Sequence, residues 1–204
     1  MKNNVEYWNH RSLNYDSRLK RSQRAYEKII ELIIKEVDQE THLLDIGTGT
    51  GVIPLHLSAH VHKIDAVDPS PEMIKIAENK AMQAGITNIA FRINEKANSI
   101  PNEPLFDVIT IVNVLHIVPN PGEILENAKR RLKKNGKIIV ATFLHNENVR
   151  SRVISYIMKK KSHPITSKFT STSLCHVLEK SSLKILYKEK ISNIMPMLYV
   201  VTSK

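Results

Sequence analysis

Short apolar runs alternate with longer amphipathic segments along most of the chain, and this alternation limits the folds that the chain can adopt. The runs are apolar almost throughout, which is typical of parallel strands buried on both faces of a sheet. They are HLLDI (42–46), KIDAVD (63–68), NIAFRI (88–93), FDVITIV (106–112) and KIIVATF (137–143). The pattern predicts a doubly wound α/β sheet whose ligand lies at the carboxyl ends of its strands.

The end of the chain departs from this alternation. The apolar runs 183–191 and 194–203 are separated by only Ser192 and Asn193, which is too short for a helical crossover. These two strands should therefore form an antiparallel hairpin. The expected helices are 22–37, 52–60, 69–85 and 120–136, the last of them closed by Asn135-Gly136.

The length of 204 residues fits one α/β domain. We expect a seven-stranded, mostly parallel sheet with a C-terminal antiparallel hairpin and helices on both faces. The expected parts are an N-terminal helical cover (1–38), a ligand-binding core (40–143), a helical insert (144–180) and the closing hairpin (183–203).

The net charge of +10 is concentrated at the two ends of the chain. Residues 1–28 carry seven Lys or Arg and three acids, and residues 146–204 carry eleven and three. Such basic segments attract nucleic acid, acidic lipid headgroups or a charged metabolite, and solvated Lys-rich faces are the alternative. The chain has no apolar run long enough to span a membrane and no signal-peptide core, so we expect a cytoplasmic protein.

Three alternating glycines follow the first predicted strand, in LLDIGTGTG (43–51). The dinucleotide fingerprint is G-x-G-x-x-G, and Val52 stands where its third glycine would be. Asp45 precedes the turn, where an NAD site has no regular use for a carboxylate. Asp68 ends the next strand, where a carboxylate can bind both hydroxyls of a ribose. The turn therefore favours a nucleoside ligand other than a dinucleotide.

LLDIGTGTG, followed by AVDPS, FDVITIVNVLHIV and RRLKKNGKIIVATF, resembles the class I S-adenosylmethionine-dependent methyltransferases. The similarity covers about residues 40–143, and a weaker similarity continues to the end of the chain. It implies an enzyme with a Rossmann-like fold that transfers a methyl group from S-adenosylmethionine to an O, N or S atom of a small molecule. The product would be S-adenosylhomocysteine, and no metal is expected.

The resemblance also implies which residues bind the cofactor. The glycine turn and Asp45 would lie under its methionine part, Asp68 on the ribose, and Pro69 and Met73 beside the adenine. The family often places an acid that binds the adenine amino group about five positions before a Leu/Ile-Pro pair. Here that count reaches Lys96, so Glu95, Asn94 or a backbone group is the alternative for this contact. The implied set is Asp45, Gly47, Thr48, Gly49, Gly51, Asp68, Pro69, Met73, Asn94, Glu95, Lys96, Asn113 and Leu115.

Few catalytic residues are needed, because the protein mainly has to align a nucleophile, exclude water and remove a proton. His116, in NVLHIV, is the candidate base at the edge of the pocket, and a histidine packed in the fold is the alternative. Tyr7, Trp8 and Tyr15 are candidates for stacking over the cofactor or a flat substrate. Anchoring an N-terminal helix is their alternative role.

The acceptor is expected to be a small molecule. NVLH lacks the Asp/Asn-Pro-Pro-Tyr/Phe tetrapeptide of family members that methylate base amino groups. Cys175, the single cysteine, is expected in a late helix away from the site. Arg150, Arg152 and Lys159–Lys161 are candidates for contacting an anionic acceptor, although such a charge run is more often a solvated helix face. An RNA methyltransferase and a non-catalytic S-adenosylmethionine-binding protein also remain open.

Overall fold

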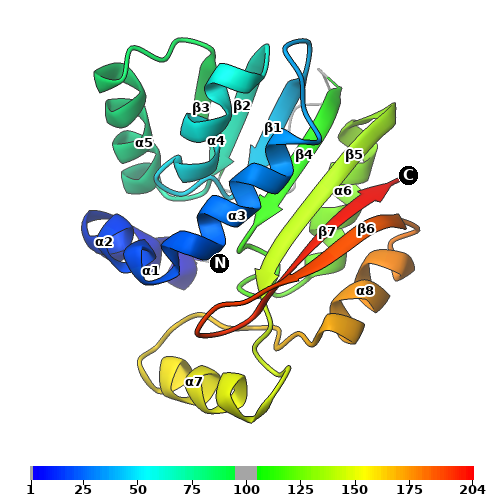
Figure 1. The fold of residues 1–204 in the computed structure, drawn as a ribbon. Coiled ribbons are helices and arrows are strands. Elements are labelled where there is room, and N and C mark those ends of the chain that lie inside the picture. The colour runs from blue at the N-terminus through cyan, green and yellow to red at the C-terminus, as the bar shows by residue number, and fades with distance from the viewer. Residues whose placement is uncertain (1, 95–104) are drawn as a thin grey trace.

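The computed structural model describes residues 2–94 and 105–204. One seven-stranded sheet has the order β3-β2-β1-β4-β5-β7-β6 (Figure 1). The strands are β1 (His42–Ile46), β2 (Lys63–Asp68), β3 (Ile89–Ile93), β4 (Phe106–Val112), β5 (Leu132–Phe143), β6 (Lys184–Ile191) and β7 (Met197–Ser203). Strands β1 to β5 pair in parallel, and β7 is antiparallel to β5 and β6. The expected doubly wound sheet with a closing hairpin is confirmed.

Helices pack on both faces of the sheet. They are α1 (Lys2–Arg11), α2 (Tyr15–Leu19), α3 (Gln23–Ile34), α4 (Val52–Leu57), α5 (Pro71–Gln83), α6 (Pro121–Arg131), α7 (Val149–Lys160) and α8 (Ser171–Lys180). Within the described ranges, every helix is too short or too polar to cross a bilayer.

Two apolar clusters form the core, one on each face of the sheet. Helices α3 and α4 contribute to the cluster that contains Leu43, and α6 and α8 contribute to the cluster that contains Leu44. Successive strand residues therefore point to opposite helical layers, which explains why the strands are apolar throughout. Helices α1 and α2 lie at the carboxyl ends of β1 and β4, away from these layers (Figure 1).

Two expected boundaries are wrong. Helix α6 ends at Arg131, and the segment expected to finish the helix instead begins β5, where Leu132 pairs with Phe106 before a register shift. A Cβ on Gly136 would lie 2.8 Å from the Asp107 carbonyl oxygen, so this glycine permits the close approach of β4 and does not close a helix. The connection between β6 and β7 spans 192–196, longer than the two residues expected.

Candidate active site

The glycine turn after β1 has a backbone that other residues rarely adopt. Its φ angles are 74° at Gly47, 54° at Gly49 and 79° at Gly51. A Cβ on Gly47 would lie 2.2 Å from Cγ2 of Val114, so the turn packs directly against the segment after β4. A Cβ on Gly49 would meet only ring carbons of Tyr15, the nearest at 3.8 Å. The backbone at Gly49 therefore presents an open surface to the site.

A cavity of about 240 Å³ lies beside this turn. It is at the carboxyl ends of β1 and β4, where the strand order reverses, which is the general ligand position in such sheets. Helices α1, α2, α5 and α6 complete its walls. The residues named from the sequence that line it are Trp8, Tyr15, Gly47, Gly49, Asp68, Pro69, Met73, Asn94 and Asn113.

Other residues named from the sequence lie outside this lining. Asp45 and Thr48 face a separate pocket of about 20 Å³ behind the glycine turn. Leu115 is fully buried in the core, in the cluster that includes α6 and α8, instead of lining the cavity. Glu95 and Lys96 fall outside the described residues, so the implied adenine contact there stays a prediction. The rest of the segment, 97–104, also falls outside the described residues.

Asp68 is held by the backbone on both of its oxygens. The amide of Gly49 donates to Oδ2 at 2.9 Å, and the amide of Ser70 donates to Oδ1 at 2.9 Å. Burial raises the pKa of Asp68 to about 6, and the two amide hydrogen bonds oppose this rise. Each carboxylate oxygen can accept a further hydrogen bond, so the group can still bind a pair of hydroxyls.

Asp45 is a second buried acid beneath the turn, with 2% of its surface exposed. The hydroxyl of Thr110 donates to Oδ1 at 2.6 Å. Oδ2 has no hydrogen-bond partner among the described residues. Burial raises the pKa of Asp45 to about 6. The linings of the two cavities share Tyr15, Gly47 and Val112, so the pocket that contains Asp45 adjoins the main cavity.

Asn113 has a left-handed backbone, with φ of 59°, directly after β4. Its Nδ2 donates to the Tyr26 hydroxyl at 2.8 Å, and its amide donates to the Ala141 carbonyl at 2.7 Å. Its buried Oδ1 has no partner within the described part of the chain. A non-glycine residue held in this conformation at a cavity wall is typical of a ligand-binding position.

Polar contacts attach the N-terminal helices to the rim of the cavity. The Ser70 hydroxyl donates to Oδ1 of Asn9 at 2.6 Å, which links α1 to the start of α5. The Thr50 hydroxyl donates to Oδ1 of Asp16 at 2.7 Å, and Lys80 pairs with Oδ2 at 2.5 Å. Helix α2 is therefore bound to both the glycine turn and α5.

An aromatic group lines the side of the cavity formed by α1. Trp8 packs edge-on against Tyr7, Tyr15 and His163, with ring centroids 5.0, 6.1 and 5.8 Å away. Trp8 and Tyr15 line the cavity, whereas Tyr7 does not. The sequence offered stacking or anchoring as alternatives, and Trp8 and Tyr15 have the geometry for both roles.

His116 is packed behind the cavity, with 3% of its surface exposed. Its Nδ1 lies 2.9 Å from the Thr142 hydroxyl, and its ring centroid lies 4.9 Å from that of His145. Burial, with His145 and His163 nearby, lowers the pKa of His116 well below its usual value. His116 does not line the cavity, so the prediction that it lies at the edge of the pocket is wrong.

Sequence reasoning missed one side of the cavity. Asn4 and Val5 of α1, the loop 117–120 and Glu123 of α6 all line it. The loop follows β4 at the reversal point of the sheet, which is the signal that could have found it. The sequence pointed to Trp8 of α1 but gave no signal for Asn4 and Val5.

The charge of the lining differs from that of the chain. Among the described lining residues none is Lys or Arg, and the charged ones are Asp68 and Glu123. Within the described part of the chain, no three His, Cys, Asp or Glu side chains are grouped to hold a metal ion. Cys175 lies in α8, as expected, and is buried in the core.

The fold and the cavity at its reversal point agree with the class I S-adenosylmethionine-dependent methyltransferases expected from the sequence. The family model described as "Methyltransferase domain" matches residues 15–188. The chain belongs to this family.

Relatives of known name or structure agree with this membership. A ubiquinone biosynthesis O-methyltransferase of Coxiella burnetii (strain RSA 331 / Henzerling II) is 26% identical over 151 residues, 71% of this chain. The match spans 64% of that relative's length, less than two thirds. The DhpI-SAM-HEP complex aligns with a TM-score of 0.77 at 14% identity, over 100% of this chain and 97% of the other. A putative methyltransferase bound to the Haloferax volcanii Trm112 activator aligns with a TM-score of 0.77 at 16% identity, over 96% of each chain.

Proposed function

We propose that the chain transfers a methyl group from S-adenosylmethionine to an oxygen, nitrogen or sulfur atom of a small molecule in the cytoplasm. The observation that carries this proposal is the lining of the cavity, which combines the glycine turn and Asp68 with an apolar wall. Oxygen is the favoured atom, since the curated relatives are named O-methyltransferases. We further propose one domain, with 1–38 as the cover, 40–143 as the core, 144–180 as the insert and 183–203 as the hairpin.

The described residues fit this cofactor. Asp68 would accept from the ribose hydroxyls, and the open backbone at Gly49 would lie against the methionine part, with Asp45 supporting the turn from behind. Pro69 and Met73 would flank the adenine. When bound, S-adenosylmethionine supplies an electrophilic methyl group. The chain's own residues orient the reactants and keep water out, which is sufficient catalysis for an acceptor that is readily deprotonated.

The apolar wall of the cavity supports a neutral, largely apolar acceptor. Val5, Ile117, Val118 and Ile124 line it, with Asn4 among the polar groups. An anionic acceptor, the possibility raised by the basic segments, would be favoured by a nearby cation, and the described lining has none. An apolar wall with a few amides binds a flat or branched neutral molecule by burial and fixes its orientation by hydrogen bonds.

Calorimetric titration with S-adenosylhomocysteine tests the cofactor half of the proposal. We expect micromolar binding by the wild type and a loss of about 100-fold for Asp68→Ala, because two charge-assisted hydrogen bonds are removed. Glu72→Ala, an exposed acid at the start of α5, is the matched control and should bind like the wild type. Absence of wild-type binding would overturn the proposal.

Methyl transfer to matched pairs of neutral and anionic phenols, amines and thiols then tests the acceptor half. Turnover that prefers the neutral member of each pair is the expected result. RNA methylation is the second candidate, favoured by the net charge of +10. It predicts turnover on RNA with tight, salt-sensitive binding. Binding of the cofactor without turnover on either pool would identify the non-catalytic alternative.

A further inference from the structure

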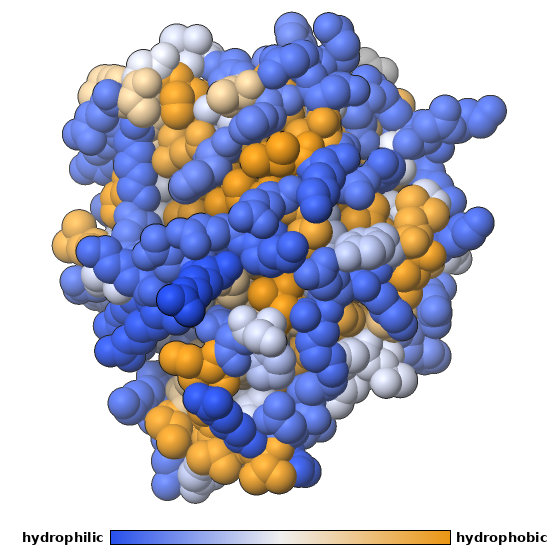
Figure 2. All heavy atoms as spheres, in the orientation of Figure 1, coloured by the Kyte–Doolittle hydropathy of each residue, from blue (hydrophilic) through white to orange (hydrophobic). Residues whose placement is uncertain are grey.

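Helix α7 exposes an apolar stripe that the methyltransferase site does not use. Val149, Val153, Tyr156 and Ile157 are 67%, 53%, 58% and 48% exposed. Their spacing places them on one face of the helix. Figure 2 shows apolar side chains gathered over this helix at the lower edge of the molecule. None of the four lines the cavity.

The opposite face of α7 packs on the protein and carries Ser151 and Ser155 together with the half-buried Ile154 and Met158. Ser151 and Ser155 are fully buried. The Ser155 hydroxyl lies 2.8 Å from Nδ1 of His145 and 2.9 Å from the His145 carbonyl oxygen. A surface helix ordinarily buries its large apolar side chains, whereas α7 leaves four of them exposed.

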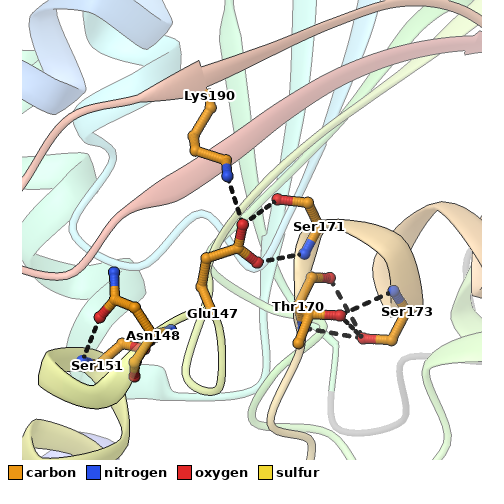
Figure 3. Close-up of polar contacts among 7 residues, drawn as sticks. All are labelled: Glu147, Asn148, Ser151, Thr170, Ser171, Ser173 and Lys190. Atoms are coloured by element: carbon orange, nitrogen blue, oxygen red, sulfur yellow. Dashed lines mark hydrogen bonds and ion pairs between the residues drawn. The ribbon is translucent and has the colours of Figure 1, made fainter.

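This orientation is fixed by contacts at the start of the helix (Figure 3). The Ser151 amide donates to Oδ1 of Asn148 at 2.8 Å, and the Asn148 amide donates to Oγ of Ser151 at 3.0 Å, forming a capping box. The preceding Glu147 accepts from the Ser171 amide at 2.7 Å and pairs with Lys190. The stripe therefore faces outward as part of the folded structure.

Basic side chains flank the stripe on both sides. At about 100° per residue, Arg150 and Lys161 fall on one side of it and Arg152 and Lys159 on the other. All four are exposed. Lys160 lies at the C-terminal end of the stripe, with its Nζ 4.9 Å from the Tyr156 ring centroid. The sequence contains no Asp or Glu from 148 to 178, so no acid neutralises this surface from within its own segment.

We propose that α7 docks the protein on an anionic lipid bilayer. The stripe would enter the boundary between headgroups and acyl chains, and the flanking Arg and Lys would contact the lipid phosphates. Nucleic acid offers phosphates but no apolar layer for four exposed apolar side chains. A bilayer offers both, side by side, and needs no complementary shape. The proposal does not depend on the identity of the methyl acceptor.

The helix is only 12 residues long, so its docking should be weak, reversible and dependent on both kinds of contact. Each basic residue near an anionic surface contributes on the order of a fivefold gain in binding, and salt screens that gain. Binding should therefore need anionic lipid and should fall as ionic strength rises.

Vesicle flotation with the full chain tests the proposal. The vesicles are phosphatidylcholine alone or an equal mixture with phosphatidylglycerol, each at low and high ionic strength. We expect the wild type to float with the mixed vesicles at low ionic strength and to remain unbound to phosphatidylcholine alone.

Two double variants separate the apolar and the charged contacts. Val153→Asp with Ile157→Asp replaces two of the four apolar residues of the stripe by acids. Arg152→Glu with Lys159→Glu reverses two of the flanking charges. Each should reduce binding at least about tenfold. The matched control, Met82→Asp with Lys75→Glu, makes both kinds of change on the exposed face of α5 and should leave binding unchanged. Circular dichroism and cofactor titration verify folding, and the charge pair alone carries the test if the apolar pair fails to fold.

Three outcomes would overturn the proposal. The first is equal binding, or none, with the two vesicle types. The second is an equal loss in the α5 control. The third is self-association of the wild type that Val153→Asp with Ile157→Asp abolishes, without vesicle binding, which would assign the stripe to contacts between copies of the chain.

Discussion

At the residue scale, Gly47 is constrained by both its backbone and its neighbour. Its φ is 74°, and a Cβ would lie 2.2 Å from Val114, whereas Gly85 has φ of 66° with no atom within 4 Å of its Cβ position. Gly47→Ala should therefore lower the free energy of unfolding by about 2–4 kcal/mol, and Gly85→Ala by only about 1 kcal/mol. Urea denaturation measures both. Equal losses would mean that the contact with Val114 relaxes freely.

The buried acids make stability fall as pH rises. Asp45 and Asp68 have pKa values raised to about 6 from 3.8, so between pH 4 and 6 the folded protein holds protons that the unfolded chain has released. The free energy of unfolding should decline across this window by up to about 3 kcal/mol per acid. Asp45→Asn keeps an acceptor for Thr110 and should flatten part of the decline.

Urea denaturation at pH 4.5 and pH 7.5 measures this effect. At the higher pH, Asp45→Asn should be more stable than the wild type by about 1–3 kcal/mol, since the neutral amide avoids burying a charge. Asp38→Asn, which changes an exposed acid in the connection before β1, is the control and should not change the slope. Stability that rises with pH in the wild type would contradict the prediction.

Substitution of His116 distinguishes a histidine packed in the fold from a catalytic base. Loss of a general base lowers turnover by about 10²–10⁴-fold. His116→Asn preserves a polar atom near the Thr142 hydroxyl, so we expect a change in kcat below about tenfold and a loss of stability of about 1 kcal/mol. Turnover of the acceptor found in the phenol, amine and thiol screen, with thermal unfolding, provides the measurement. A loss above about 100-fold in a folded variant would restore the role of base.

At the element scale, the contact between α2 and the glycine turn should control cofactor retention. Asp16 bonds Thr50 and pairs with Lys80, and the adjacent Tyr15 lines the cavity. Asp16→Ala should loosen α2 and weaken binding of S-adenosylhomocysteine about three- to tenfold, mainly by faster dissociation. Stopped-flow measurements of dissociation provide the test. Ser17→Ala, which removes only a bond to the Asn14 carbonyl, should match the wild type.

The elements themselves differ in how well the sequence predicts them. Strands β1, β2 and β4 match the expected ranges because apolar runs buried on both faces end abruptly at polar turns. The helical pattern before Gly136 was misleading, because pairing of Leu132 with Phe106 overrides local helix propensity. The exposure of the apolar stripe of α7 is also invisible to periodicity, which finds an apolar face but not whether that face points inward.

In the candidate site too, residues placed by local sequence were predictable, and residues placed by contacts between distant segments were not. Gly47, Gly49 and Asp68 were predictable because they lie within a few residues of strand ends, where topology brings side chains together. The placement of His116 behind the cavity depends on contacts with Thr142 and His145, which are far away in the sequence. No local pattern contains that information.

At the scale of the whole molecule, the positive charge and the cofactor cavity are separate. The net charge is +10, yet the described lining contains no Lys or Arg. Charges on the surface are screened beyond about 8–10 Å in physiological salt, whereas hydrogen bonds inside a cavity are screened little. Raising the salt concentration should therefore weaken binding through the surface charge and leave binding in the cavity nearly unchanged.

Thermal unfolding with S-adenosylhomocysteine tests this division. A ligand at 100 times its Kd stabilises the folded state by about 2.7 kcal/mol, and we expect this gain to change by less than about 0.5 kcal/mol between low and high salt. Retention on a heparin column, which reports the surface charge, should be lost over the same range. If the gain from the ligand falls in step with heparin retention, cations from outside the described lining must contact the cofactor, and the separation of charge and cavity would be refuted.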